Sequence, residues 1–251
     1  MTERALDDPR WGDAGRERKA GAIRGTLRRA RGDVPAGTWL DIGCGSGDLA
    51  AELCRVGLPD EMIGADPEPW ARWQSLTAND DRLRLLRADC ESLAGLLGPA
   101  CADLVVCNQV YEHVPDPQSL IRVIGELLRP GGLCYFAGPN LLWPIEPHVY
   151  WPFVHWLPRD AAQLTMRVLG SRRSRELDAN STSWRTLRRW FDDAGLVARS
   201  VLRERVAEEF AARGAVTLAR VSAVLPRASF FEPLAPGFIY LLERPMAPGP
   251  R

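Results

Sequence analysis

The sequence predicts an α/β fold in which helices cover both faces of a mostly parallel sheet. Two observations lead to this prediction. Strand-like apolar runs alternate with helical patterns from about residue 38 to residue 138, as in successive βαβ units. A glycine-rich stretch, GCGSG at residues 43–47, stands where the first strand-like run meets the helix after it. Such a junction is typical of ligand-binding α/β sheets.

Each element follows from the spacing of its apolar residues. An amphipathic helix is predicted over residues 16–30, where Ala20, Ile23, Leu27 and Ala30 share one face. The strand-like runs that follow are residues 38–43, 61–66, 82–89, 102–108 and 133–138. The helical patterns between them are residues 48–55, 68–78, 92–97 and 117–128. This alternation continues until Pro139.

The chain of 251 residues is expected to form one domain, residues 1–251, with four parts. A helical cap (1–35) precedes the core (36–138), and residues 182–251 complete the fold with helices and antiparallel strands. Residues 139–181 are rich in proline and tryptophan and interrupt the alternation, so they are predicted to be an insertion after the fifth strand. We call residues 139–181 the lid insertion. Regularity returns with a helix ending at Gly195, a helix over 207–219 and a final strand, GFIYLLER.

Composition narrows the function classes. Lysine plus arginine equals aspartate plus glutamate at 32 each, so no net charge attracts nucleic acid or an anionic membrane. The six cysteines contain no C-x-x-C pair and the N-terminus is charged, which favours a reduced cytoplasmic protein without structural zinc. Prolines interrupt the apolar residues 223–242, so no membrane insertion is expected. A homodimer is compatible with the sequence.

The glycine loop predicts a bound ligand. Gly43, Gly45 and Gly47 let a ligand lie against the backbone, and amides at the start of the following helix favour an anionic group. A dinucleotide fingerprint would need glycine one position after Gly47, where the chain has Asp48. A carboxylate beside a pyrophosphate is unfavourable, so a nicotinamide cofactor is disfavoured.

Two further aspartates end the next strands. Asp66 closes the second strand and can accept two hydrogen bonds from a ribose diol, and Asp89 closes the third. Because the carboxyl ends of parallel strands lie along one edge, these residues and the glycine loop predict one binding crevice.

The segments WLDIGCGSGDLA, GADPEP, RADCESL and ADLVVCNQVYEHVPDPQSLIRVIGELLRPGGLCYFAGPN resemble the class I S-adenosylmethionine-dependent methyltransferases over about residues 38–140. The resemblance implies a Rossmann-like, seven-stranded sheet ending in an antiparallel hairpin. It also implies S-adenosylmethionine as cofactor, S-adenosylhomocysteine as product, and no metal.

The resemblance also implies a role for each matching residue. Asp41 with Gly43, Gly45 and Gly47 would hold the amino-acid part of the cofactor. Asp66 would hold the ribose, with Pro67 beside it in the cofactor site. The remaining residues implied are Asp89 for the adenine amino group, the Cys90 backbone for the adenine ring edge, and Asn108 and Gln109 for the sulfonium side.

Two histidines are the candidate catalytic bases. His113, in YEHVPDP, matches a position that the family often fills with histidine, where it faces the substrate or supports its loop. His148 lies in the lid insertion with Glu146 two residues before it, so it is either a base oriented by that carboxylate or a turn residue. His155 is more typical of a wall residue.

The lid insertion carries Trp143, Tyr150, Trp151, Phe153 and Trp156, which either line an apolar acceptor pocket or pack the insertion onto the sheet. Its arginines either bind an anionic acceptor group or form a solvated face; they are Arg167, Arg172, Arg173 and Arg175.

The predicted function is methyl transfer from S-adenosylmethionine to a small molecule. O-methylation of a hydroxyl or carboxylate of a metabolite or natural product is favoured because histidines are available to take a proton. The stretch NQVYEH, where nitrogen-methylating nucleic-acid and protein members often carry a [DN]PP[YF]-type motif, favours a small acceptor. The alternatives are N- or C-methylation and a non-catalytic S-adenosylmethionine-binding protein.

Overall fold

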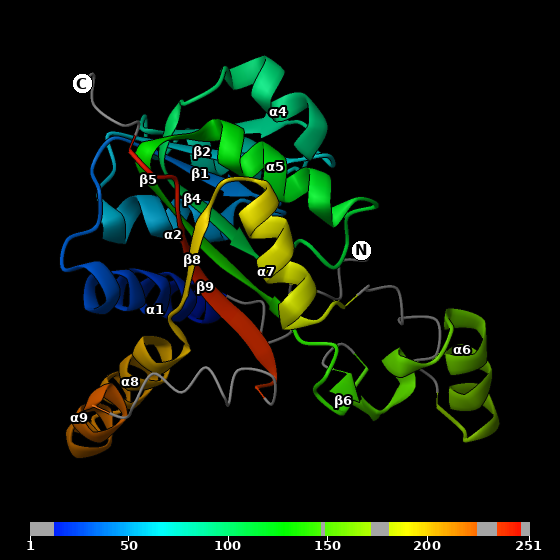
Figure 1. Ribbon diagram of the computed structural model, residues 1–251. Helices are drawn as coiled ribbons and strands as arrows, with labels where there is room; N and C mark the ends of the chain where they lie inside the picture. The colour runs from blue at the N-terminus through cyan, green and yellow to red at the C-terminus, as the bar shows by residue number, and fades with distance from the viewer. Residues whose placement is uncertain (1–12, 147–148, 172–180, 225–234, 247–251) are drawn as a thin grey trace.

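The computed structural model describes residues 13–146, 149–171, 181–224 and 235–246 (Figure 1). Across these residues, seven strands form one sheet in the order β3-β2-β1-β4-β5-β9-β8, and β6 and β7 form a separate hairpin. The strands of the sheet are β1 (Thr38–Ile42), β2 (Glu61–Asp66), β3 (Leu83–Arg87), β4 (Ala102–Asn108), β5 (Leu128–Pro139), β8 (Val197–Ser200) and β9 (Gly237–Glu243).

Pairing within the sheet is parallel except at β9. This strand is antiparallel to both of its neighbours, β5 and β8. The order of the other strands reverses direction at β1, which has β2 on one side and β4 on the other. The predicted Rossmann-like fold, with its antiparallel ending, is therefore confirmed.

Helices cover both faces of the sheet (Figure 1). The main helices are α1 (Asp13–Arg31), α2 (Asp48–Gly57), α3 (Trp73–Thr77), α4 (Cys90–Leu97), α5 (Pro117–Leu127), α6 (Arg159–Val168), α7 (Trp184–Asp193), α8 (Leu202–Ala212) and α9 (Val216–Val224). Residues of α1 and α2 pack with Trp39 in the core of one face. Residues of α4, α5 and α7 pack with Phe136 in the core of the other face.

The predicted first helix buries the stripe that defined it. Ala20, Ile23 and Leu27 are at most 1% exposed. This burial fixes α1 against α2, in the same apolar cluster as Trp39 of β1.

Several predicted boundaries differ from the structure, and three of these differences are large. The helix expected over residues 68–78 is only Trp73–Thr77, because Pro67 and Pro69 flank Glu68 and the residue before a proline avoids helical angles. The helix expected over 207–219 is two helices, α8 and α9, separated at Gly214, whose φ is +75°. Strand β5 begins five residues before the predicted 133, since Leu128 already pairs with Ala102.

Residues 140–171 of the lid insertion pack on themselves. They contain β6 (Ile145–Glu146), β7 (Trp151–Pro152), the 3-10 helix η2 (Val154–Trp156) and α6. A small apolar cluster, separate from the two cores beside the sheet, joins these elements through Val149, Val154, Ala162 and Met166. In Figure 1 this unit projects away from the sheet beyond the end of β5.

Candidate active site

The glycine loop joins β1 to α2 at the carboxyl edge of the sheet. Gly43, Gly45 and Gly47 all have positive φ, at +70°, +52° and +83°. A side chain at Gly43 would meet Val110, and one at Gly47 would meet Leu85, so close packing requires glycine at both positions. Among the described residues, apart from Gly45 itself and its two chain neighbours, no atom lies within 4 Å of the position a Cβ would take at Gly45. Gly45 is thus the glycine that leaves open space for a ligand.

The amides of the loop are used within the protein. Gly43 and Cys44 both donate to the carbonyl of Ala65, at 2.8 and 3.1 Å, and Gly47 donates to the carbonyl of Cys44 at 3.0 Å. The Gly45 amide donates to Oδ2 of Asp66 at 2.9 Å. Each of these four N–H groups therefore already has an acceptor within the protein.

Asp41, the fourth residue of β1, carries a buried carboxyl group. The residue is 2% exposed, and among the described residues its Oδ2 has no hydrogen-bond partner. Burial raises the pKa of Asp41 to about 7, although nearby Lys19 and Arg16 act in the opposite direction. A buried acceptor without a donor is costly, so Asp41 is suited to a cationic ligand group.

Lys19 on α1 is a candidate residue that the sequence interpretation did not select, and its charge acts on Asp41. Burial is the main cause that lowers its pKa, followed by repulsion from Arg16, and the charges of Asp41 and Glu112 oppose this change. Lys19 is the only lysine in the chain and lies four residues before Ile23, in line with the buried stripe of α1. A lysine in an apolar stripe was the signal that could have identified it.

Asp66 ends β2 beside the glycine loop. Besides accepting from the Gly45 amide, its other oxygen, Oδ1, accepts from the amide of Glu68 at 3.0 Å. These two bonds fix the carboxylate in one orientation at the edge of the sheet. Pro67 is exposed next to it, and its carbonyl accepts from Nε of Arg87 at 3.2 Å.

Asp89 begins helix α4. Its Oδ1 accepts from the Ser92 amide at 2.9 Å, which makes Asp89 the N-cap of α4, and the bonds with Ser92 lower the pKa of the carboxyl group. Cys90 is half-buried at the first position of α4, and burial raises the pKa of its thiol. Asp89 is exposed, so it keeps solvent access while it caps the helix.

The segment after β4 approaches the glycine loop. Asn108 is the last residue of β4, and Gln109 adopts a left-handed conformation with φ at +61°. The Val110 side chain lies over Gly43, as described above. Further along, Glu112 is fully buried and its Oε1 is 4.0 Å from Nε2 of His113, whose side chain is 44% exposed. His113 therefore combines solvent access with a buried carboxylate neighbour.

The lid insertion contains the remaining candidate residues, and the structure describes only some of them. His148, Arg172, Arg173 and Arg175 lie outside the described residues. Glu146 is 1% exposed and its Oε2 accepts from the Val149 amide at 2.6 Å. Nε2 of His155 is 3.1 Å from the carbonyl oxygen of Leu141. Arg167 is exposed at the end of α6.

The aromatic residues of the lid insertion do not pack onto the sheet as a group. Tyr150, Phe153 and Trp156 are 58%, 52% and 50% exposed, and the rings of Phe153 and Trp156 contact each other with centroids 4.9 Å apart. Trp151 packs against the separate cluster of the insertion. These side chains therefore remain available to an acceptor.

Comparison with known proteins identifies the family of this chain. A family model described as "Methyltransferase domain" matches residues 14–201. The "Ubiquinone biosynthesis O-methyltransferase" of Serratia proteamaculans (strain 568) is 36% identical over 116 residues, which are 45% of this chain and 47% of that protein. The protein of the same name from Xanthomonas campestris pv. campestris (strain B100) is 34% identical over 140 residues, or 52% of this chain and 56% of that protein. The chain spans about half the length of these curated relatives.

Solved structures support the fold. An S-adenosylmethionine-dependent methyltransferase from Mesorhizobium loti has a TM-score of 0.56 at 16% identity, covering 89% of this chain and 98% of that one. The plantazolicin methyltransferase BpumL, in complex with a monoazolic desmethylPZN analog and SAH, has a TM-score of 0.58 at 13% identity, with coverage of 95% and 87%. The chain belongs to the methyltransferase domain family, and the predicted membership of the class I S-adenosylmethionine-dependent methyltransferases is confirmed. None of the helices in the described part of the chain is long and apolar enough to cross a membrane.

Proposed function

We propose that this protein transfers a methyl group from S-adenosylmethionine to an oxygen of a small metabolite or natural product, either a hydroxyl or a carboxylate. The observation that carries the proposal is the buried Asp41 carboxyl, influenced by Lys19, at the strand end that leads into the open Gly45. The curated relatives are named O-methyltransferases, which supports oxygen as the acceptor atom.

The residues at the carboxyl edge fit the parts of this cofactor. Asp41 would accept from its cationic ammonium group, and Lys19 would pair with its carboxylate. Asp66 would accept from the ribose hydroxyls with lone pairs that the Gly45 and Glu68 amides leave available. When bound, S-adenosylmethionine supplies an electrophilic methyl group on a sulfonium. Among the described residues beyond its two chain neighbours, none lies within 4 Å of the Cβ position at Gly45, which supports room for the cofactor there.

The adenine and sulfonium ends of the cofactor would meet the next strand ends. Asp89 and the Cys90 backbone, with Pro67 beside them, would contact the adenine. Asn108 and Gln109 would lie on the sulfonium side, because β4 is the neighbour of β1 on the side away from β2.

His113 would accept the proton of the acceptor hydroxyl. Its Nε2 is 4.0 Å from Oε1 of the buried Glu112, so the carboxylate would stabilise the imidazolium that forms. A carboxylate acceptor has no proton to lose at neutral pH and would need only positioning. His148 remains the second candidate base, and the exposed aromatic residues of the lid insertion would contact an apolar acceptor.

The first experiment is calorimetric titration with S-adenosylmethionine and S-adenosylhomocysteine. We expect both to bind the unsubstituted protein and to bind Asp66→Ala at least about tenfold more weakly, because a ribose diol loses its charged acceptor. Asp60→Ala is the matched control, since Asp60 is exposed at the opposite end of β2. Equal affinity of all three proteins would contradict the proposed site. Failure of the unsubstituted protein to bind either compound would contradict the proposed function.

Acceptors would then be screened by release of S-adenosylhomocysteine, starting with phenols, alcohols and carboxylic acids that carry apolar groups. Turnover with oxygen acceptors supports the proposal. Turnover only with amines or carbon nucleophiles would contradict O-methylation but keep methyl transfer. Tight cofactor binding without turnover of any acceptor would favour a non-catalytic binding protein.

A further inference from the structure

The segment that follows β2 makes two contacts with the glycine loop and the start of α2. The indole N–H of Trp73, the first residue of α3, donates to the carbonyl of Gly45 at 2.8 Å. The preceding residue, Arg72, uses Nε to donate to Oδ1 of Asp48, the first residue of α2. Neither Arg72 nor Trp73 is in the cofactor site described above.

The buried carboxylate of Asp48 needs a cationic partner, and Arg72 provides it. The residue is 8% exposed, and its two oxygens accept from Arg72 and from Oγ of Ser46, the latter at 2.8 Å. An ionised carboxylate at such a position is costly without a cationic partner. The start of a helix favours the negative charge but does not replace a guanidinium. Arg72 therefore holds Asp48, and through Ser46 it holds the centre of the glycine loop.

Packing adds to the hydrogen bonds. A Cβ at Gly47 would lie 2.7 Å from Leu85, 3.2 Å from Leu76 and 3.3 Å from Trp73. The indole ring thus lies directly against the loop while its N–H bonds to Gly45. Since interiors are close-packed, movement of this ring would change the path of the loop.

The amide and the carbonyl of Gly45 bond to two different residues of the segment that starts at the end of β2. The amide of Gly45 donates to Asp66 and the carbonyl of Gly45 accepts from Trp73, so Gly45 is held from both sides by the segment that begins at the end of β2. Gly45 is also the loop glycine that leaves open space, so a shift of its peptide would move the surface that meets the ligand.

We infer that Arg72 and Trp73 are positioning residues that hold the glycine loop and Asp66 in the arrangement that binds S-adenosylmethionine. This inference rests on the proposed function. It assigns them no contact with the cofactor. Their contribution is to remove alternative loop conformations, so that the cofactor does not have to order the loop when it binds.

The experiment measures the affinity for S-adenosylhomocysteine by calorimetry in three variants. We expect Arg72→Met to bind about tenfold more weakly, because Asp48 then carries an unpaired buried charge. We expect Trp73→Phe to bind S-adenosylhomocysteine several-fold more weakly, because the substitution removes one hydrogen bond while retaining an aromatic ring. The double variant Arg72→Met/Asp48→Asn should regain most of the affinity, since it removes the unpaired charge as well.

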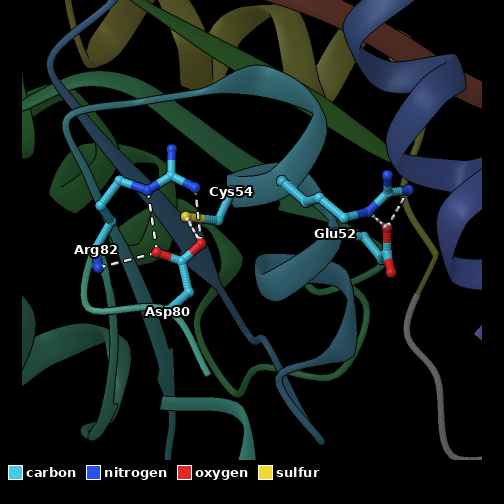
Figure 2. Close-up of polar contacts among 5 residues, drawn as sticks. Glu52, Cys54, Asp80 and Arg82 are labelled. Carbon is cyan, nitrogen blue, oxygen red and sulfur yellow. Dashed lines mark hydrogen bonds and ion pairs between the residues drawn. The ribbon is translucent and has the colours of Figure 1, made fainter. Parts of the chain in front are cut away.

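A matched control lies near the other end of α3. Figure 2 shows the Asp80 carboxylate between Arg82 and the thiol of Cys54. Nη2 of Arg82 is 2.7 Å from Oδ2 of Asp80, so this is also an arginine–aspartate pair, but it does not touch the glycine loop. Arg82→Met should therefore leave the affinity unchanged.

Thermal unfolding of every variant separates positioning from general loss of stability. The inference is supported if Arg72→Met weakens binding, Arg82→Met does not, and removing the Asp48 charge restores binding. Equal affinity in Arg72→Met, Trp73→Phe and the unsubstituted protein would overturn it. A loss in Arg72→Met that Asp48→Asn does not restore would overturn the role of the ion pair. Absence of binding by the unsubstituted protein would contradict the proposed function and this inference together.

Discussion

The hydroxyl of Tyr111 donates a hydrogen bond to the carbonyl oxygen of Pro139. Pro139 is the last residue of β5 and the first residue of the lid insertion. The same hydroxyl accepts from the amide of Thr182, the residue after that insertion ends, at 3.3 Å. A single buried side chain from the segment after β4 therefore connects both ends of the lid insertion to the candidate active site.

Tyr111→Phe tests this connection. We expect a loss of about 1 to 3 kcal/mol in the free energy of unfolding, because a buried carbonyl and an amide lose their partner while the ring still stacks on Phe136. Denaturant unfolding measures the loss. Tyr135→Phe is the control: its hydroxyl has only a 3.4 Å contact with Arg205, so its loss should be smaller. Similar losses in both would contradict a special role for Tyr111.

Cofactor affinity should depend on the ionisation of Asp41. Because its pKa is about 7, the carboxyl group must lose a proton to pair with the cofactor ammonium at lower pH. We expect affinity to be about tenfold weaker at about pH 6 than at about pH 8. Calorimetry at several pH values, in buffers of different ionisation enthalpy, measures both the affinity and the released proton. Asp41→Asn should bind weakly with no such pH dependence, and a pH-dependent Asn variant would exclude Asp41 as the cause.

The same pKa has the opposite effect on the stability of the free protein. The pKa of Asp41 is raised from an ordinary 3.8, so folding favours its protonated form. Its stabilising contribution is complete below the ordinary pKa and is lost as the pH rises through about 7. The free energy of unfolding of the cofactor-free protein should thus decrease as the pH rises from 3.8 to about 7. The decrease should be smaller in Asp41→Asn. An identical pH dependence in both proteins would contradict the assignment.

Lys19→Met should weaken binding of S-adenosylhomocysteine by about tenfold or more, because the amino-acid carboxylate loses a charged donor. It should also move the midpoint of the pH dependence upward, since the charge of Lys19 lowers the pKa of Asp41. Arg18→Met is the control, as Arg18 is the exposed neighbour on α1. Calorimetric titration at several pH values compares Lys19→Met with Arg18→Met. Equal affinities and equal pH midpoints in the two variants would contradict a role for Lys19 in binding.

Gly45→Ala should abolish cofactor binding by filling the space that the ligand needs. Strain alone must be excluded, because φ at Gly45 is +52° and alanine there costs about 1 kcal/mol. Gly195→Ala carries similar strain, with φ at +69° and open space around it, but lies beyond α7. Both variants should lose similar stability, and only Gly45→Ala should lose affinity. Retained binding in Gly45→Ala would contradict the position proposed for the cofactor.

His113→Gln should lower turnover of an oxygen acceptor by about a hundredfold or more while S-adenosylhomocysteine binds as before. His155→Gln is the matched control because Nε2 of His155 faces the Leu141 carbonyl. Steady-state kinetics with the acceptor found by screening provides the test. If His113→Gln is fully active and His148→Gln is not, the base is in the lid insertion.

The sequence alone determined the class of fold and predicted the edge of the sheet where the candidate cofactor residues lie. Strand period, helix period and the glycine loop are local properties, so they predicted β1 through β5 and placed Asp41, Asp66 and Asp89 near three strand ends. The predicted helix boundaries were wrong where a proline or a glycine interrupted a helical pattern of apolar residues. Prolines at 67 and 69 shortened α3, and Gly214 divided α8 from α9.

Tertiary structure determined the contacts between residues that are far apart in the sequence, which the spacing of residues along the chain cannot predict. Lys19 comes near Asp41 only because α1 folds over the sheet, and Arg72 finds Asp48 only because α3 packs on the glycine loop. Both pairs join residues more than twenty positions apart, and their energies depend on burial, which the folded chain alone defines. Likewise, only the folded chain shows that the carbonyls of Ala65 and Cys44 and the carboxylate of Asp66 accept hydrogen bonds from amides of the glycine loop. The sequence therefore predicted where a site would lie, whereas packing determined which groups there already have partners within the protein.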